Sequence, residues 1–115
     1  DIKAKDGQVV CAKESAVFHT GVHVQLPKGT AGILISKSGL NVKEGITSTG
    51  LIDEGYTGEI VVKLYNHSGY DYWVEKGDKI SQLVIVPVLY DRVEIVNELE
   101  ESERGLNGFG STGRR

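Results

Sequence analysis

Short apolar segments recur along the chain, and polar or glycine residues separate them. Several of them alternate apolar with polar positions, which is the period of a strand with one buried face. The expected strands cover residues 9–12, 16–18, 22–26, 31–35, 59–66, 70–74 and 80–88. The run 31–35 is expected to be buried on both faces, because it has no polar position. Strands about ten residues apart with turns between them predict an all-β sandwich or jelly roll.

The stretch from Gly50 to Ile60 combines an apolar run, an acidic tip and several glycines, and alternation resumes after it. This pattern predicts two strands joined by a tight glycine-containing turn. Asp53 lies where the apolar run ends, so the turn can direct its carboxylate at whatever lies above the loop. Tyr56 is close enough in the chain to line the same cavity. A plain surface turn is the alternative, because acidic residues and glycine favour turns for backbone reasons alone.

Composition narrows the classes of function. A chain of 115 residues is enough for one domain. Its net charge of -3 argues against a surface that coats nucleic acid, although a nucleotide needs only a local cluster of cations. Cys11 is the only cysteine, so no disulfide forms within the chain, and no apolar stretch reaches the roughly 18 residues of a membrane span. We therefore expect a cytoplasmic protein with no nucleic-acid or membrane partner.

Polar residues at the ends of expected strands are further candidates. Lys37, Ser38 and Gly39 follow the buried run and could offer a phosphate a cation, a hydroxyl and a backbone N–H; a polar turn is the alternative. Gln82 interrupts the last apolar strand, so it is either paired to backbone or directed at a ligand. The histidines at 19, 23 and 67 have no carboxylate or cysteine at metal-ligand spacing and are interpreted as ordinary residues.

The tail after residue 98 changes from acidic to glycine-rich to basic. Such a composition is typical of a flexible end. Phe109 is unusual there, however, and Arg104, Ser111 and Thr112 are residues that a phosphate recruits. We interpret the tail as a segment that is disordered when empty and folds over a bound nucleotide. Its glycine spacing at 108–113 matches the dinucleotide-binding pattern, but not the strand and helix that this motif requires on either side.

Four segments in this order, 36–40, 50–56, 77–83 and 104–113, closely resemble motifs two to five of the trimeric dUTP diphosphatases (dUTPases). The resemblance implies a jelly-roll-like β domain over 1–100 and a tail at 101–115 that closes over the active site of a homotrimer. It implies hydrolysis of dUTP to dUMP and pyrophosphate, with water attacking the α-phosphorus and Mg²⁺ as cofactor. Each site would combine the hairpin of one chain, motifs two and four of a second and the tail of a third.

The resemblance also implies roles for individual residues. Asp53 would be the general base, and Asp1 would hold Mg²⁺ through water. Tyr56 would pack against the deoxyribose, where its ring leaves no room for a 2′-hydroxyl. The residues implied to bind substrate are Lys37, Ser38, Gly39, Thr47, Gly50, Leu51, Ile52, Tyr56, Val61, Gln82, Arg104, Phe109, Gly110, Ser111 and Thr112.

Within that set, the backbone around 50–52 together with Val61 would read uracil, while Phe109 would stack on it. Lys37 and Gln82 would contact the phosphates, and the rest of the tail would close on the γ-phosphate. The chain departs from the family pattern at three places. Lys37 replaces an arginine, Thr47 or Ser48 stands where an asparagine is common, and Gly55 replaces a second carboxylate.

The sequence has three alternative interpretations. A dCTP deaminase shares the fold but needs a glutamate-centred site, and the Phe-Gly-Ser-Thr-Gly tail speaks against it. A phage-borne regulatory module that binds a partner protein under nucleotide control would be favoured by an extra segment between the hairpin and Gly77, and the sequence has none. An inactive jelly-roll module would not require four motifs in order.

Overall fold

The computed structural model describes residues 1–108. Nine short strands and one helical turn make up its regular structure, so the all-β prediction is confirmed. The elements are β1 Ile2–Lys3, β2 Gln8–Val10, β3 Ser15–His19, β4 Thr30–Ile35, η1 Leu40–Glu44, β5 Ile46–Thr47, β6 Thr49–Ile52, β7 Val61–Asn66, β8 Tyr72–Val74 and β9 Lys79–Pro87. The helical turn η1 was not predicted from the sequence.

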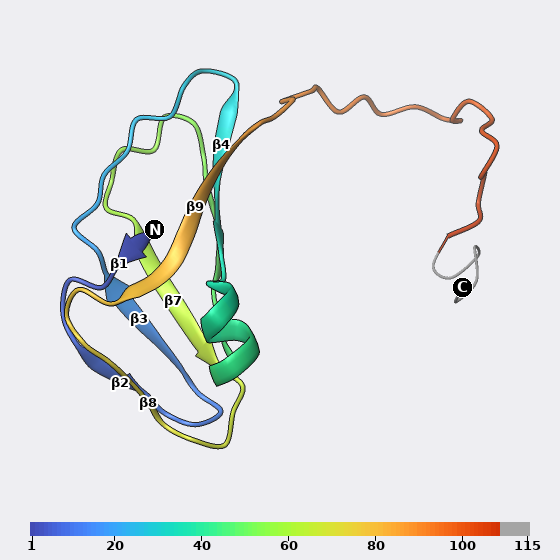
Figure 1. Cartoon of the computed structure of the whole chain (residues 1–115). Helices are drawn as coiled ribbons and strands as arrows, with labels where there is room; N and C mark the ends of the chain where they lie inside the picture. The colour runs from blue at the N-terminus through green and yellow to red at the C-terminus, as the bar shows by residue number, and fades with distance from the viewer. Residues whose placement is uncertain (109–115) are drawn as a thin grey trace.

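The strands form three antiparallel sheets around one core (Figure 1). The largest has the order β1-β9-β4-β6, a second has β3-β7-β5, and β2 pairs with β8. Side chains from the sheets meet in one apolar cluster, in which Phe18, Ile60, Leu64 and Ile80 are almost completely buried. This is how a jelly roll satisfies the alternation of the sequence, because each strand turns its apolar face to the shared interior.

Burial of β4 is less complete than the sequence indicated. Ala31, Gly32 and Leu34 are buried, but Ile33 is only half-buried and Ile35 is exposed. The prediction of burial on both faces is therefore wrong for the second face within one chain. β4 is nevertheless central in its sheet, because it pairs with β9 on one side and β6 on the other.

The predicted hairpin around residue 53 is half right. A tight turn is present, in which the Tyr56 N–H donates to the Asp53 carbonyl over 3.1 Å and Gly55 has a φ of +88°. The strands on either side do not pair with each other, however. β6 pairs with β4, whereas β7 pairs with β3 and β5, so the turn crosses from one sheet to the other.

Two further expectations need correction. The segment 22–26 forms no strand, although Val22, Val24 and Leu26 still turn inward while the residues between them are exposed. The strand expected at 70–74 is shorter, because β8 covers only Tyr72–Val74. Tyr72 packs against the core, but Tyr70 and Trp73 are 82% and 70% exposed.

Beyond β9 the chain leaves the body of strands. Val88 N–H still bonds the carbonyl of Gly29 over 3.0 Å, and the following residues run outward along an extended path (Figure 1). Every residue from 89 to 107 is exposed. The domain boundary at 100/101 stays a prediction. Among the residues described, no helix has the length and apolar character needed to cross a bilayer.

Candidate functional site

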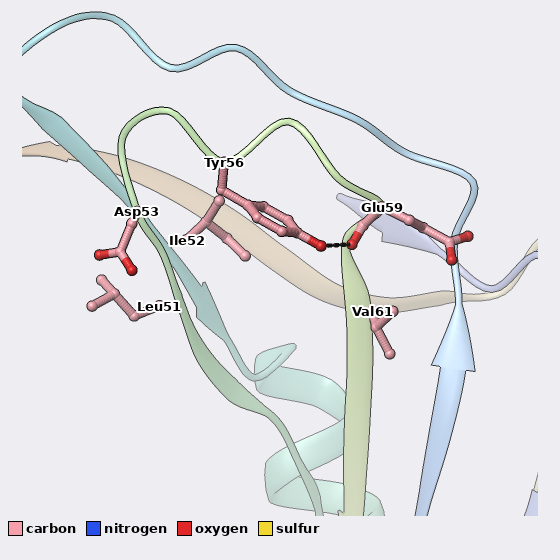
Figure 2. Close-up of a pocket in the computed structure, with 6 residues that line it drawn as sticks. All are labelled: Leu51, Ile52, Asp53, Tyr56, Glu59 and Val61. Carbon is pink, nitrogen blue, oxygen red and sulfur yellow. Dashed lines mark hydrogen bonds between the residues drawn. The ribbon is translucent and has the colours of Figure 1, made fainter.

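The crossing between β6 and β7 forms a pocket of about 280 Å³ (Figure 2). Its lining residues come from the end of β6, the turn and the start of β7: Leu51, Ile52, Asp53, Tyr56, Glu59 and Val61. Five of the six were candidates from the sequence. Glu59 was not, because an acidic residue after a glycine carries no specific signal in a single sequence.

The Tyr56 ring forms one wall of this pocket. Its hydroxyl donates to the carbonyl oxygen of Glu59 over 2.7 Å (Figure 2). The ring also lies directly against Gly58, where a β-carbon would come within 2.6 Å of the Tyr56 hydroxyl oxygen and 2.7 Å of Cζ. The local sequence thus places the ring, because the turn brings residue 56 back over residues 58 and 59.

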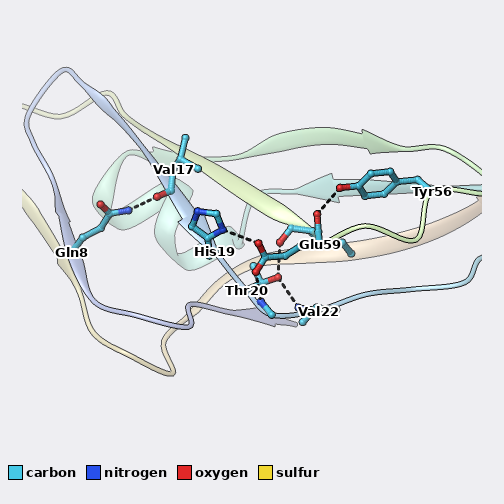
Figure 3. Close-up of polar contacts among 9 residues, drawn as sticks. Gln8, Val17, His19, Thr20, Val22, Tyr56 and Glu59 are labelled. Carbon is cyan, nitrogen blue, oxygen red and sulfur yellow. Dashed lines mark hydrogen bonds and ion pairs between the residues drawn. The ribbon is translucent and has the colours of Figure 1, made fainter.

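The Glu59 side chain points away from the pocket toward the end of β3 (Figure 3). Its carboxylate accepts hydrogen bonds from His19 Nδ1 over 2.7 Å and from the Gly21 N–H over 2.9 Å. The bond from His19 and then the bond from the Gly21 backbone lower the pKa of Glu59 below its ordinary value. His19 was interpreted as an ordinary strand residue, and only the β3–β7 register brings it to Glu59.

The candidates for phosphate binding lie together at the other end of β4. Lys37 follows β4, and its Nζ contacts Asp1 Oδ1 over 2.6 Å, while Lys79 Nζ lies 3.7 Å from Oδ2 of the same carboxylate. Gln82 in β9 donates from Nε2 to the Ser36 carbonyl over 3.2 Å, so it is paired to backbone in this structure. Gly39 precedes η1 and is exposed, as is Ser38.

This second group rests on a buried hydroxyl pair. Ser48 Oγ and Ser81 Oγ lie 2.7 Å apart, and Ser81 also donates to the Ile35 carbonyl over 3.0 Å. Both serines are buried. These bonds join β9 and β4 to residue 48, close to Gln82 in β9 and to Lys37, which follows β4.

The pocket and the candidates for phosphate binding are far apart within one chain. Gly32 pairs with Ile52, and Ile35 pairs with Thr49, so Asp53 lies near the start of β4 whereas Lys37 follows its end. Because Asp53 follows Ile52, it lies opposite Ala31. At about 3.3 Å per residue, the six residues from 31 to 37 separate it from Lys37 by roughly 20 Å. The structure therefore brings Asp53 together with Tyr56, and Lys37 together with Asp1, but not one pair with the other.

Two further candidates lie outside both groups. Thr47, in β5, bonds His67 Nε2 through its hydroxyl over 2.7 Å and does not line the pocket. Arg104 is exposed on the outgoing segment, where its Nε donates to the Asn107 carbonyl over 2.8 Å. Phe109, Gly110, Ser111 and Thr112 lie outside the described residues.

Residues 1–108 contain no group of three or more His, Cys, Asp or Glu side chains that could hold a metal ion. Mg²⁺ often needs only one or two carboxylates beside substrate phosphates and waters. Asp1, a single carboxylate next to the lysine expected to attract phosphate, fits that mode of binding.

Comparison with known proteins gives one consistent answer. The family model described as dUTPase matches residues 1–113. The deoxyuridine 5'-triphosphate nucleotidohydrolase of Clostridium acetobutylicum is 47% identical over 116 residues, covering 98% of this chain and 80% of the relative. A solved Staphylococcus bacteriophage 80alpha dUTPase with dUPNHPP matches with a TM-score of 0.90 and 34% identity, over 98% of this chain and 84% of that one.

A second solved structure bears on the metal. It is a variant dUTPase from phage phi11 of S. aureus, described as revealing the coordination of a structural Mg(II) ion. It matches with a TM-score of 0.80 and 30% identity, over 88% of this chain and 84% of that one.

Proposed function

This chain belongs to the dUTPase family, and we propose that it hydrolyses dUTP to dUMP and pyrophosphate. The observation that carries the proposal is the pocket at the β6–β7 crossing, where one turn places the Asp53 carboxylate and the Tyr56 ring on the same cavity. The relative from C. acetobutylicum, of which this chain spans 80%, is named for this activity.

Asp53 takes the proton from the attacking water. The water oxygen forms a bond to the α-phosphorus as the bond from that phosphorus to the α,β-bridging oxygen breaks, and pyrophosphate leaves. Positioned proton transfer of this kind is worth roughly 10²–10⁴ in rate. The remaining acceleration comes from holding the water in line and from neutralising oxygen charge. Lys37 and Gln82, with Ser38 and Gly39, supply that neutralisation and positioning.

The pocket selects the nucleoside. Leu51 and Val61 provide apolar surface, and the backbone of Gly50 to Ile52 offers donors and acceptors to the uracil edge. A site built from fixed backbone groups rejects a base whose groups would be left unpaired. The Tyr56 ring lies where the sugar would pass, so a ribose hydroxyl would collide with it.

Magnesium would reduce the charge repulsion among the phosphates. Asp1 is the side chain of this chain that would hold it, through water, beside the phosphates that Lys37 binds. Both Asp1 oxygens face lysines in the structure, and a triphosphate would compete for the same two cations. We therefore expect a chelator to abolish turnover.

A complete site requires more than one chain. The roughly 20 Å between Asp53 and Lys37 within a chain supports a homotrimer in which the pocket of one chain meets the phosphate-binding candidates of the next. The outgoing segment supports the same assembly. Leu89, Val93, Ile95 and Leu99 are 82% exposed or more, and such apolar residues favour a covering surface. The tail, with Arg104 and the residues from Phe109 to Thr112, would close the third side.

The experiment measures pyrophosphate release from dUTP, UTP, dCTP and dTTP, with magnesium and with chelator, for the wild type and Asp53→Asn. We expect turnover of dUTP alone, dependent on magnesium, and a loss of roughly 10²–10⁴ in the variant without loss of binding. Ammonia released from dCTP would overturn the proposal in favour of the deaminase. Tight dUTP binding without turnover would favour the regulatory module, which the short loop of 67–71 between β7 and β8 does not favour.

A further inference from the structure

Glu59 connects the pocket to the strand behind it. Its carbonyl oxygen accepts the Tyr56 hydroxyl proton over 2.7 Å, while its carboxylate accepts bonds from His19 Nδ1 and the Gly21 N–H over 2.7 and 2.9 Å (Figure 3). One residue therefore bonds the wall of the pocket through its backbone and the end of β3 through its side chain. The Glu59 side chain is 27% exposed and that of His19 is 65% exposed.

The next residue holds the same segment in place. Ile60 is fully buried, its N–H donates to the Val22 carbonyl over 2.8 Å, and its carbonyl accepts the Thr20 hydroxyl. With the two bonds to the Glu59 carboxylate, four hydrogen bonds join 59–60 to 19–22. A group that touches a ligand is positioned well only when its support is rigid, and this support lies directly beneath the Tyr56 contact.

The ring depends on that support. Tyr56 is 46% exposed, so packing alone leaves its orientation weakly fixed. Gly58 allows the ring to lie against the backbone, because no β-carbon occupies the space. The hydroxyl bond to Glu59 then selects one orientation among those that Gly58 permits.

We propose that Glu59, held by His19 and Gly21, is a positioning residue that fixes the Tyr56 ring and thereby sets discrimination against ribonucleotides. The inference rests on the function proposed above, because it assumes that the ring faces the sugar. Without the anchor the ring moves, the 2′-hydroxyl is tolerated and dUTP is held less tightly. The chemistry at Asp53 is affected less, because Asp53 lies at the opposite end of the turn.

The test compares Glu59→Ala, Glu59→Gln, His19→Ala and the control Asp71→Ala. The control removes a carboxylate that accepts the Ala12 N–H over 2.8 Å, a contact of the same kind away from the pocket. For Glu59→Ala we expect the ratio of kcat/KM for dUTP to that for UTP to fall roughly tenfold, mainly through KM, since bonds to a charged group are lost. His19→Ala should show part of this fall. Glu59→Gln keeps an acceptor oxygen and should retain most of the wild-type ratio, and Asp71→Ala should leave the ratio unchanged.

A structural measurement separates the two proposals. In protein with labelled tyrosine, the Tyr56 ring signal, assigned with Tyr56→Phe, should shift or broaden in Glu59→Ala and stay in place in Asp71→Ala. Absence of dUTP turnover in the wild type would overturn the proposed function. Normal wild-type turnover with an unchanged dUTP/UTP ratio and an unmoved ring signal in Glu59→Ala would overturn the positioning role alone.

Discussion

At the scale of single residues, the pocket depends on the absence of a side chain at Gly58 as well as on the side chains that line it. Gly58 has no β-carbon, and the Tyr56 ring occupies the space where one would lie. Glycine at this position is therefore set by close approach of the ring, since its φ is not in the left-handed range that favours glycine.

Gly58→Ala should therefore displace the ring without unfolding the protein. The new methyl group would lie 2.6–2.9 Å from Tyr56 ring atoms, and the half-exposed ring can swing outward to avoid it. We expect KM for dUTP to rise roughly tenfold, because a misplaced contact group costs binding, and stability to change by less than about 1 kcal/mol. Steady-state kinetics and urea denaturation measure the two quantities. The control is Gly69→Ala, where a β-carbon meets nothing within 4 Å; equal kinetics in both variants would contradict the account.

At the scale of elements, a few buried polar side chains hold strands of different sheets in register. Asn66, at the end of β7, is 2% exposed and donates to the carbonyls of Val10 and Tyr70 over 2.9 and 2.8 Å. Its Oδ1 accepts the N–H and hydroxyl of Ser68. One amide thus joins β7, the end of β2 and the loop that leads to β8.

Asn66→Ala should lower the free energy of unfolding by roughly 2–4 kcal/mol, because buried carbonyls lose their partners. Denaturant titration at one fixed protein concentration measures this, since an oligomer's stability depends on concentration. The exposed Asn97 provides the control, for which Asn97→Ala should change stability by less than about 0.5 kcal/mol. If Asn66→Ala lowers the free energy of unfolding no more than Asn97→Ala does, Asn66 does not hold these segments together.

The Glu59 contact makes stability depend on pH in a defined direction. Hydrogen bonds from His19 and Gly21, aided by the more distant charge of Lys5, lower the pKa of Glu59 in the folded protein below its ordinary 4.5. The folded state therefore favours the ionised carboxylate, so this stabilisation is present above pH 4.5 and is lost as pH falls through the lowered pKa. The stability difference between wild type and Glu59→Gln should shrink as pH is taken from 6 to 3. A difference that stays constant across that range would refute the linkage.

At the scale of the whole molecule, the pocket and the candidates for phosphate binding lie at different ends of one strand. Asp53 and Lys37 lie at opposite ends of β4, and nothing within residues 1–108 covers the apolar side chains of the outgoing segment (Figure 1). Active sites shared between chains would explain both the separation of Asp53 from Lys37 and the exposure of the outgoing segment.

Shared sites can be tested by mixing two inactive proteins. In an oligomer made of Asp53→Asn alone, every site lacks the Asp53 carboxylate. In one made of Lys37→Ala alone, every site lacks the Lys37 cation. Refolded together at equal amounts, they should regain about a quarter of wild-type turnover, because one site in four then draws an intact Asp53 from one chain and an intact Lys37 from another. Activity no higher than that of the separate proteins would mean that both residues act within one chain. Light scattering on the mixture checks that assembly has occurred.

The sequence by itself determined most of the strands, the turn at 53–56 and the four motifs, because alternation, turn chemistry and short spacings act over a few residues. Asp53 and Tyr56 share a pocket for that local reason. The tertiary structure alone decided that β6 pairs with β4 and not β7, that His19 meets Glu59 and that Asp1 meets Lys37. His19 and Glu59 lie 40 residues apart in the chain, and Asp1 and Lys37 lie 36 apart. Pairing over such separations follows from sheet register and the packing of a shared core, which no single segment contains.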